Sequence, residues 1–91
     1  MLLATSKVNL AAGYRFQWEA AQECYVLLYP EGMIKLNPSA GEILKRCDGR
    51  ELQAIVAELQ QAFPEFASGI ENDVREFVTH AQEKSWLTVQ N

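Results

Sequence analysis

Three short segments in the first half of the chain show the patterns of β-strands. Aromatic and polar residues alternate from Tyr14 to Glu19, and this period of two places three rings on one face of a strand. Cys24 to Tyr29 is apolar or aromatic throughout, which is typical of a central strand covered on both faces. Pro30 to Gly32 favours a turn into a third strand over Met33 to Leu36. We therefore expect a three-stranded antiparallel sheet whose first and third strands are edges.

The rest of the chain shows three helical patterns. Asn37 or Ser39 can cap the first helix, Asp48-Gly49 is expected to end it, and a capping box at Ser68 to Glu71 is expected to open the third. The apolar residues at helical spacing are Ala40, Ile43, Leu44 and Cys47 in the first helix, Leu52, Ile55, Val56, Leu59 and Phe63 in the second, and Ile70, Val74, Phe77, Val78 and Ala81 in the third. This order predicts an α+β fold, a three-stranded antiparallel sheet followed by three helices.

The length of 91 residues fits one domain. We expect residues 1–12 to be an N-terminal extension and residues 13–91 to form the folded domain. No apolar run approaches the roughly 20 residues of a membrane-spanning helix, and Met1 to Ala4 is too short for the core of a signal peptide. A cytoplasmic protein that does not bind membranes is therefore expected.

Side chains that could carry chemistry are few. Cys24 and Cys47 are too far apart for a C-x-x-C pair and are expected to be ordinary, partly buried thiols. His80 is the only histidine, so neither a zinc site nor acid–base catalysis is indicated, and it fits a surface position or the wall of a ligand groove. Four carboxylates fall on the solvated side of the last helix, namely Glu71, Asp73, Glu76 and Glu83. We expect no enzyme, no metal and no cofactor.

Winged-helix DNA-binding proteins also combine three helices with a small sheet, so a DNA-binding regulator is the alternative. The net charge is -4, and residues 51–91 carry seven of the twelve acidic groups but two of the eight basic ones. A helix that reads a DNA groove normally presents a basic face, whereas the last helix pattern holds Arg75 and Lys84 against four acids. We therefore expect no nucleic-acid partner.

Several segments, taken in order, resemble the PqqD family. They are Tyr14 to Trp18, Tyr25 to Gly32, Leu36 to Leu44, Cys47-Asp48-Gly49, Asp73 to Phe77 and Trp86-Leu87, and the resemblance spans about residues 8 to 88. Two positions depart from the family pattern. Glu51-Leu52 stands where the family usually has a small hydroxyl residue and valine, and Ser85 where it usually has glycine. The second departure puts in doubt how the last helix is capped, because serine adopts a positive φ less readily than glycine.

The resemblance implies a winged-helix-like peptide-binding domain of the kind called a RiPP recognition element. In this family the protein binds the precursor peptide PqqA and presents it to the radical S-adenosylmethionine enzyme PqqE, with no catalysis of its own. The third strand and the last helix form the walls of the peptide cleft. The residues expected to bind peptide are Met33, Ile34, Lys35, Leu36, Val74, Phe77, Val78 and Ala81, and the apolar ones among them also fit a core role.

An extended peptide can add a strand to an exposed sheet edge, which offers a physical mechanism for this binding. On that hypothesis Ile34→Pro removes a backbone donor and weakens binding. The acidic C-terminal half, including Glu76 and Glu83, is the hypothetical docking face for the enzyme. A monomer or a weak homodimer is expected, because a free edge can pair with a second copy.

Overall fold

The computed structural model describes residues 1–91 as an α+β fold with six strands, three α-helices and one 3₁₀ turn. In chain order the elements are β1 (Lys7–Leu10), β2 (Arg15–Glu19), β3 (Cys24–Tyr29), β4 (Gly32–Lys35), α1 (Pro38–Leu44), β5 (Asp48–Glu51), α2 (Leu52–Ala62), η1 (Pro64–Phe66), α3 (Ala67–Glu83) and β6 (Leu87–Gln90). The predicted fold class is confirmed. No helix is both long and apolar enough to pass through a bilayer.

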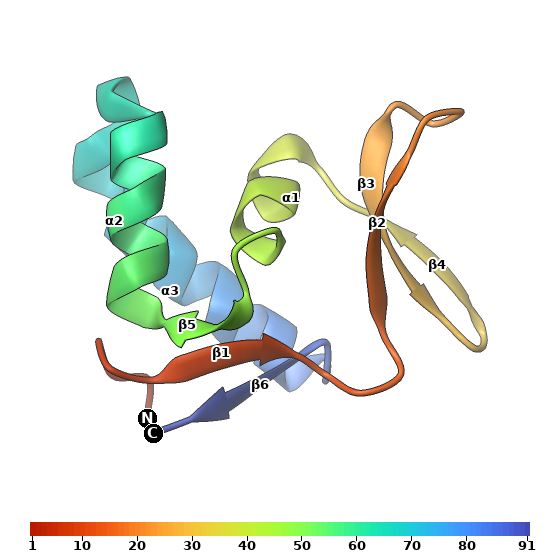
Figure 1. Cartoon of the computed structure of the whole chain (residues 1–91), viewed down its shortest axis with the longest axis horizontal. Helices are drawn as coiled ribbons and strands as arrows, with labels where there is room; N and C mark the ends of the chain where they lie inside the picture. Colours follow the sequence, from red (N-terminus) through yellow and green to blue (C-terminus); the bar gives the residue numbers. More distant parts are fainter.

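The predicted sheet is present as β2-β3-β4, antiparallel throughout, and it projects to one side of the helices (Figure 1). The rings that the alternating pattern placed on one face stack on those of β3. Phe16 lies 4.7 Å from Tyr25 between ring centroids, and Trp18 meets the same ring edge-on at 5.0 Å. These cross-strand aromatic pairs stabilise a ribbon that few other elements cover.

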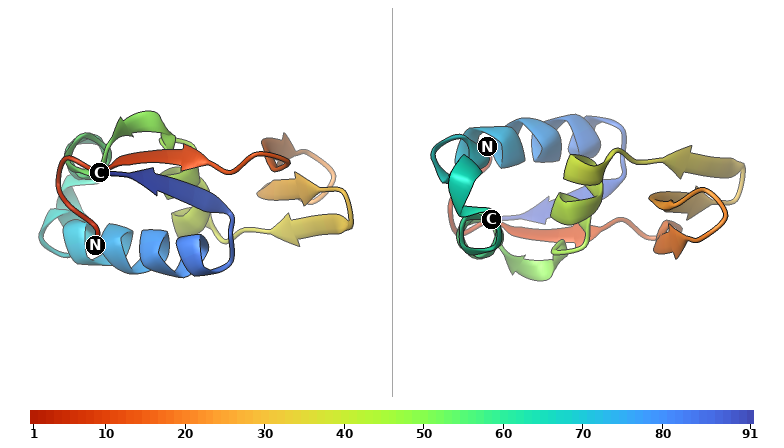
Figure 2. Two further views of the ribbon diagram at one scale, coloured as in Figure 1. Left: turned by 90° about the horizontal axis from the view of Figure 1, so that it is seen from below. Right: turned by 90° about the horizontal axis from the view of Figure 1, so that it is seen from above.

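A second sheet, in the order β5-β1-β6, was not expected from the sequence. Its central strand, β1, lies within residues 1–12, and Val8 on this strand is fully buried. Figure 2 shows β1 and β6 side by side, with α3 along one side of the sheet. We propose that the folded domain begins with β1, because Val8 and Leu10 pack against the core.

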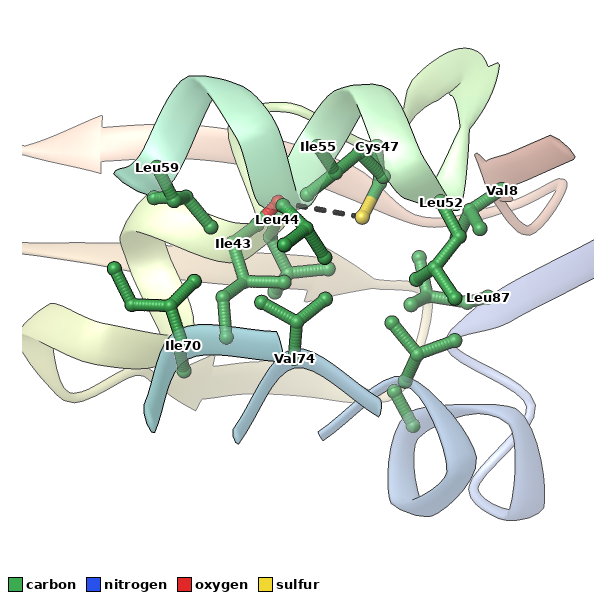
Figure 3. Close-up of a cluster of buried hydrophobic side chains, with 14 of the residues drawn as sticks. Val8, Ile43, Leu44, Cys47, Leu52, Ile55, Leu59, Ile70, Val74 and Leu87 are labelled. Atoms are coloured by element: carbon green, nitrogen blue, oxygen red, sulfur yellow. Dashed lines mark hydrogen bonds between the residues drawn. The ribbon is translucent and has the colours of Figure 1, made fainter. Parts of the chain in front are cut away.

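The core lies where the three helices meet this second sheet. The predicted apolar stripes of α2 and α3 face inward, and Figure 3 shows Ile43 and Leu44 of α1 lying between side chains of those two helices. Cys47 belongs to the same cluster, and its thiol donates to the Ile43 carbonyl oxygen at 3.3 Å (Figure 3). Both cysteines are free, Cys47 is buried and Cys24 is partly buried.

Helix α1 begins as predicted and ends earlier than predicted. Asn37 is its N-cap, since the side-chain oxygen accepts the Ala40 N–H at 2.8 Å. The helix ends at Leu44, and Asp48-Gly49, expected to stop it, instead opens β5. The reason is tertiary, because these residues pair with β1 across the sheet.

Gly41 of α1 lies close to Tyr25 of β3. A Cβ at this position would lie 2.7 Å from Cδ2 of Tyr25 and 3.3 Å from its Cβ and Cγ. The glycine therefore permits an approach that no larger residue allows at the same spacing.

The C-terminal end of α3 is a Schellman motif, the arrangement that a helix adopts when its last residue is followed by one with positive φ. The Trp86 N–H donates to the Ala81 carbonyl at 2.9 Å and the Ser85 N–H to the Gln82 carbonyl at 3.0 Å. Ser85 occupies the left-handed position with φ 66. The predicted capping box at the other end is wrong, because α3 starts at Ala67 with no side-chain cap bond.

Replacing Gly41 by alanine is expected to destabilise the protein. Overpacking costs about 1–3 kcal/mol, and this exceeds the gain of about 1 kcal/mol that alanine brings to a helix. Gly69→Ala is the matched control, because it also lies in a helix and its added Cβ meets nothing within 4 Å. Chemical unfolding should show a lower midpoint for Gly41→Ala and an unchanged or higher one for Gly69→Ala. Equal midpoints would show that the Tyr25 ring can move aside.

Ser85→Gly is expected to stabilise the protein by about 1 kcal/mol. The left-handed conformation costs a residue with a Cβ about 1–2 kcal/mol, and the greater freedom of glycine in the unfolded chain offsets part of the gain. Lys84→Gly serves as the control, since Lys84 has φ -83 and should lose stability on the same change. Thermal unfolding of the two variants checks the sign, and a lower melting temperature for Ser85→Gly would contradict the argument.

Candidate functional site

Strand β4 is an open edge of its sheet, and its outward backbone groups can be identified from one hydrogen bond. The Leu36 N–H donates to the Tyr25 carbonyl at 3.0 Å, so Leu36 points its backbone toward β3. In an antiparallel pair this direction alternates, and Ile34, opposite Leu27, therefore also points inward. Met33 and Lys35 consequently direct their N–H and C=O groups away from the sheet. These are the groups that an added strand would use.

A cleft of about 380 Å³ lies beside this edge, between the end of β4, helix α1 and the C-terminal half of α3. Its lining residues are Ile34, Lys35, Leu36, Asn37, Ser39, Ala40, Ile43, Asp73, Phe77, His80 and Trp86. Six of the eleven are hydrophobic, and we call these six residues the floor of the cleft; the charged lining residues are Lys35 and Asp73. A mostly apolar cleft with a few polar groups is the usual form of a binding site.

The structure brings together half of the residues that the sequence analysis expected to bind peptide. Ile34, Lys35, Leu36 and Phe77 line the cleft. Val74, Val78 and Ala81 are buried in the core and do not line it. Met33 does not line it either, and its side chain, 42% exposed, alternates with that of Ile34 to the other face of the sheet.

Other lining residues were not expected. Asp73 and His80 fall on the same face of α3 as Phe77, four residues before it and three after it, so helical spacing alone could have found them. His80 packs edge-on against Trp86, with ring centroids 5.9 Å apart. His80 is exposed and also lines the cleft, so both of its sequence interpretations fit the structure. Trp86 carried no local signal, because it reaches the cleft through the turn after α3.

The strongest charge cluster lies away from the cleft and holds β5 against α2. Arg46 bonds Glu58 at 2.8 Å and Glu42 at 2.9 Å, while Arg50 bonds Glu58 and Asp48. Hydrogen bonds from Arg50 lower the pKa of both Asp48 and Glu58, so these carboxylates stay ionised partners of the arginines. Every charge in the cluster has a partner, and its role is structural.

Two further observations bear on chemistry. Burial raises the pKa of the Cys47 thiol to about 12, which leaves it protonated at neutral pH and a poor nucleophile. No three side chains of the histidine, cysteine, aspartate or glutamate type converge in a way that could hold a metal ion. The cleft itself combines features of a binding surface: an edge with open backbone groups, an apolar floor and two charged residues.

Comparison with known proteins gives consistent results. The family model for coenzyme PQQ synthesis protein D (PqqD) matches residues 24–87. A protein of Azotobacter vinelandii named PqqA binding protein is 60% identical over 80 residues, which cover 87% of this chain and 86% of that protein. Relatives with the same name in Klebsiella pneumoniae and Acinetobacter baylyi are 53% and 47% identical and cover 92% and 86% of this chain.

One solved structure is similar over almost the whole chain. It is the solution NMR structure of the PqqD truncation of Methylobacterium extorquens PqqCD, described as a functional and stand-alone RiPP recognition element. The TM-score is 0.78 at 26% sequence identity, and the match covers 97% of this chain and 95% of the other.

Proposed function

The chain belongs to the PqqD family, and on that premise we propose that it binds the peptide PqqA along the edge of β4 and presents it to the enzyme PqqE, without catalysing a reaction itself. Relatives in several bacteria are named for PqqA binding, and the similar NMR structure is described as a peptide recognition element. The wider assignment, peptide binding in PQQ biosynthesis, follows from the family. The site on β4 and the handover to PqqE are our proposal.

One observation carries the proposed site: Met33 and Lys35 direct their backbone groups outward from the open edge of β4, and this edge runs into a cleft that Lys35 lines and α3 walls. An extended peptide can continue the β2-β3-β4 ladder through these groups. Its side chains then alternate, and those directed inward meet the apolar floor beside Phe77. Backbone bonds supply affinity in such a mode, while the floor selects side chains.

The charges of α3 favour a peptide over duplex DNA. Its only arginine, Arg75, is engaged by Glu71 at 3.2 Å and by the Leu2 carbonyl at 2.9 Å. Phosphate contacts need free basic side chains, and α3 instead exposes a series of carboxylates. The regulator alternative therefore has no specific support in the structure.

The exposed carboxylates Glu76 and Glu83 are proposed to lie on the face that meets PqqE. Both are on the solvent side of α3, close to the cleft wall yet outside its lining. A partner bound there would approach the peptide from the helix side. Charge at such a rim mainly accelerates association and makes it salt-dependent.

We expect Lys35→Pro to weaken PqqA binding about tenfold, because it removes an outward N–H and adds a ring at the edge where the peptide pairs. Lys35→Ala is the matched control, since it removes the same charge and keeps the N–H. Calorimetric titration with synthetic PqqA measures both affinities, and thermal unfolding confirms that both variants fold. Met33→Pro provides a second test at the other outward position.

The Ile34→Pro change suggested by the sequence is a poor test, because the Ile34 N–H points to β3 and its loss would disrupt the protein's own sheet. Equal affinity of folded Lys35→Pro, Met33→Pro and unaltered protein would show that PqqA does not add to this edge. Backbone amide shifts in an NMR titration would then locate the true site.

Reversal of both charges, Glu76→Lys with Glu83→Lys, is expected to slow association with PqqE several-fold at low salt and to leave PqqA affinity unchanged. Stopped-flow association at two ionic strengths measures the effect. Glu65→Lys, on η1, combined with Glu23→Lys, between β2 and β3, is the control for net charge, since it also reverses two exposed charges and neither lies on α3. Association rates that respond equally to all reversals would point to general charge rather than to a docking face.

A further inference from the structure

A second cavity, about 400 Å³, adjoins the cleft on the side away from β4. It lies between α1, the end of α2 with η1, and the N-terminal half of α3. Its lining residues are Pro38, Ser39, Glu42, Ile43, Leu59, Phe63, Phe66, Ile70, Asp73 and Val74. Six of these ten are hydrophobic, so the cavity is suited to an apolar side chain.

The two cavities form one groove along α3. Ser39, Ile43 and Asp73 line both of them. From Phe66 at one end to His80 at the other the groove follows a single face of the helix, fourteen residues of chain or about 21 Å at the rise of an α-helix. An extended peptide of about six residues spans that distance, whereas β4 has 4 residues to pair with.

Phe66 is the feature of this cavity that the fold itself does not explain. The residue is 65% exposed and does not belong to the core cluster. It precedes the first residue of α3, where it makes no capping bond. A large aromatic ring left in water at the border of an apolar cavity adds little to stability and offers contact area to a ligand.

The charged side chains that line this cavity are all acidic. Its charged lining residues are Glu42 and Asp73. Glu42 is neutralised by Arg46 at 2.9 Å, while Asp73 makes no ion pair and no side-chain hydrogen bond. The unpaired carboxylate stands at the junction of the two cavities. A basic group on the ligand at this point would gain a partner.

We propose that the bound peptide continues beyond β4 and places an apolar side chain in the second cavity against Phe66, with a basic residue beside it at Asp73. This proposal rests on the proposed function, since it takes the same peptide as occupant. Continuity of the groove supports that choice over a separate partner, and the net charge of -4 disfavours a second copy of the chain. The inference sets the footprint of the peptide at more than the four residues of β4.

The test uses the full-length protein, synthetic PqqA and a set of PqqA peptides shortened stepwise from each end. Phe66→Ala is expected to weaken binding of full-length PqqA about tenfold, the effect of losing one aromatic contact in an interface. Leu3→Ala is the matched control, because Leu3 is an exposed apolar residue, 40% accessible, outside both cavities. Asp73→Asn should weaken binding less, and this loss should shrink as salt is added.

Shortened peptides separate the two cavities. Once a peptide has been shortened enough at one end to leave the second cavity empty, it should bind Phe66→Ala and the unaltered protein equally well. The same peptide should still bind Lys35→Pro more weakly than the unaltered protein. Amide shifts at Ile70 and Asp73 on the unaltered protein, present with full-length PqqA and absent with such a peptide, give a readout that needs no variant.

Three results would overturn the inference, and they differ in whether the proposed function is overturned as well. If Phe66→Ala binds every peptide as the unaltered protein does while Lys35→Pro weakens binding, the second cavity is not used and strand addition stands. If Phe66→Ala weakens all peptides equally, including the shortest, its effect comes through the fold. If the unaltered protein binds no PqqA, the proposed function fails and this inference fails with it.

Discussion

The close approach of α1 to β3 at Gly41 is the contact on which the binding surface depends. The projecting sheet has few other attachments to the body of the protein, and Tyr25 fills the space that a side chain at position 41 would need. Next to this contact β4 ends at Lys35, and the following residue, Leu36, is buried and lines the cleft together with residues of α1. Because Gly41 has no Cβ, α1 can lie close to β3, and this spacing fixes the position of the β4 edge relative to the helices. A small shift of α1 relative to β3 would change the width of the cleft.

The local part of the fold could be predicted from the sequence. The alternating rings of β2, the apolar run of β3 and the helical stripes of α2 and α3 each occupy one continuous segment. The second sheet could not, because its strands have 4 residues each and come from three distant parts of the chain. Asp48 to Glu51 shows no hydrophobic alternation, and only pairing with β1 makes it a strand.

The candidate site was predictable only in outline. Resemblance to a family pointed to β4 and α3, but the residues of each that face the cleft depend on three-dimensional facts. One hydrogen bond, from Leu36 to Tyr25, decides that Met33 and Lys35 carry the open backbone groups. On α3 the stripe is wide enough to serve both core and cleft, so Val74 and Val78 turn inward while Asp73 and Phe77 reach the surface. Sequence periodicity therefore predicts which residues of α3 are in the stripe, but only the packing shows which of them belong to the core and which to the cleft.

The pairing of β1 with β6 affects the order in which the protein folds during synthesis. Lys7 lies opposite Gln90, so the second sheet joins residues from nearly opposite ends of the sequence. Contacts of such separation form late, because a long loop must close first, and during synthesis they must wait until Leu87–Gln90 have left the ribosome. The β2-β3-β4 ribbon needs only its neighbours. In a nascent chain the open edge of β4 is therefore exposed before the helices and the second sheet that lie beside it have formed.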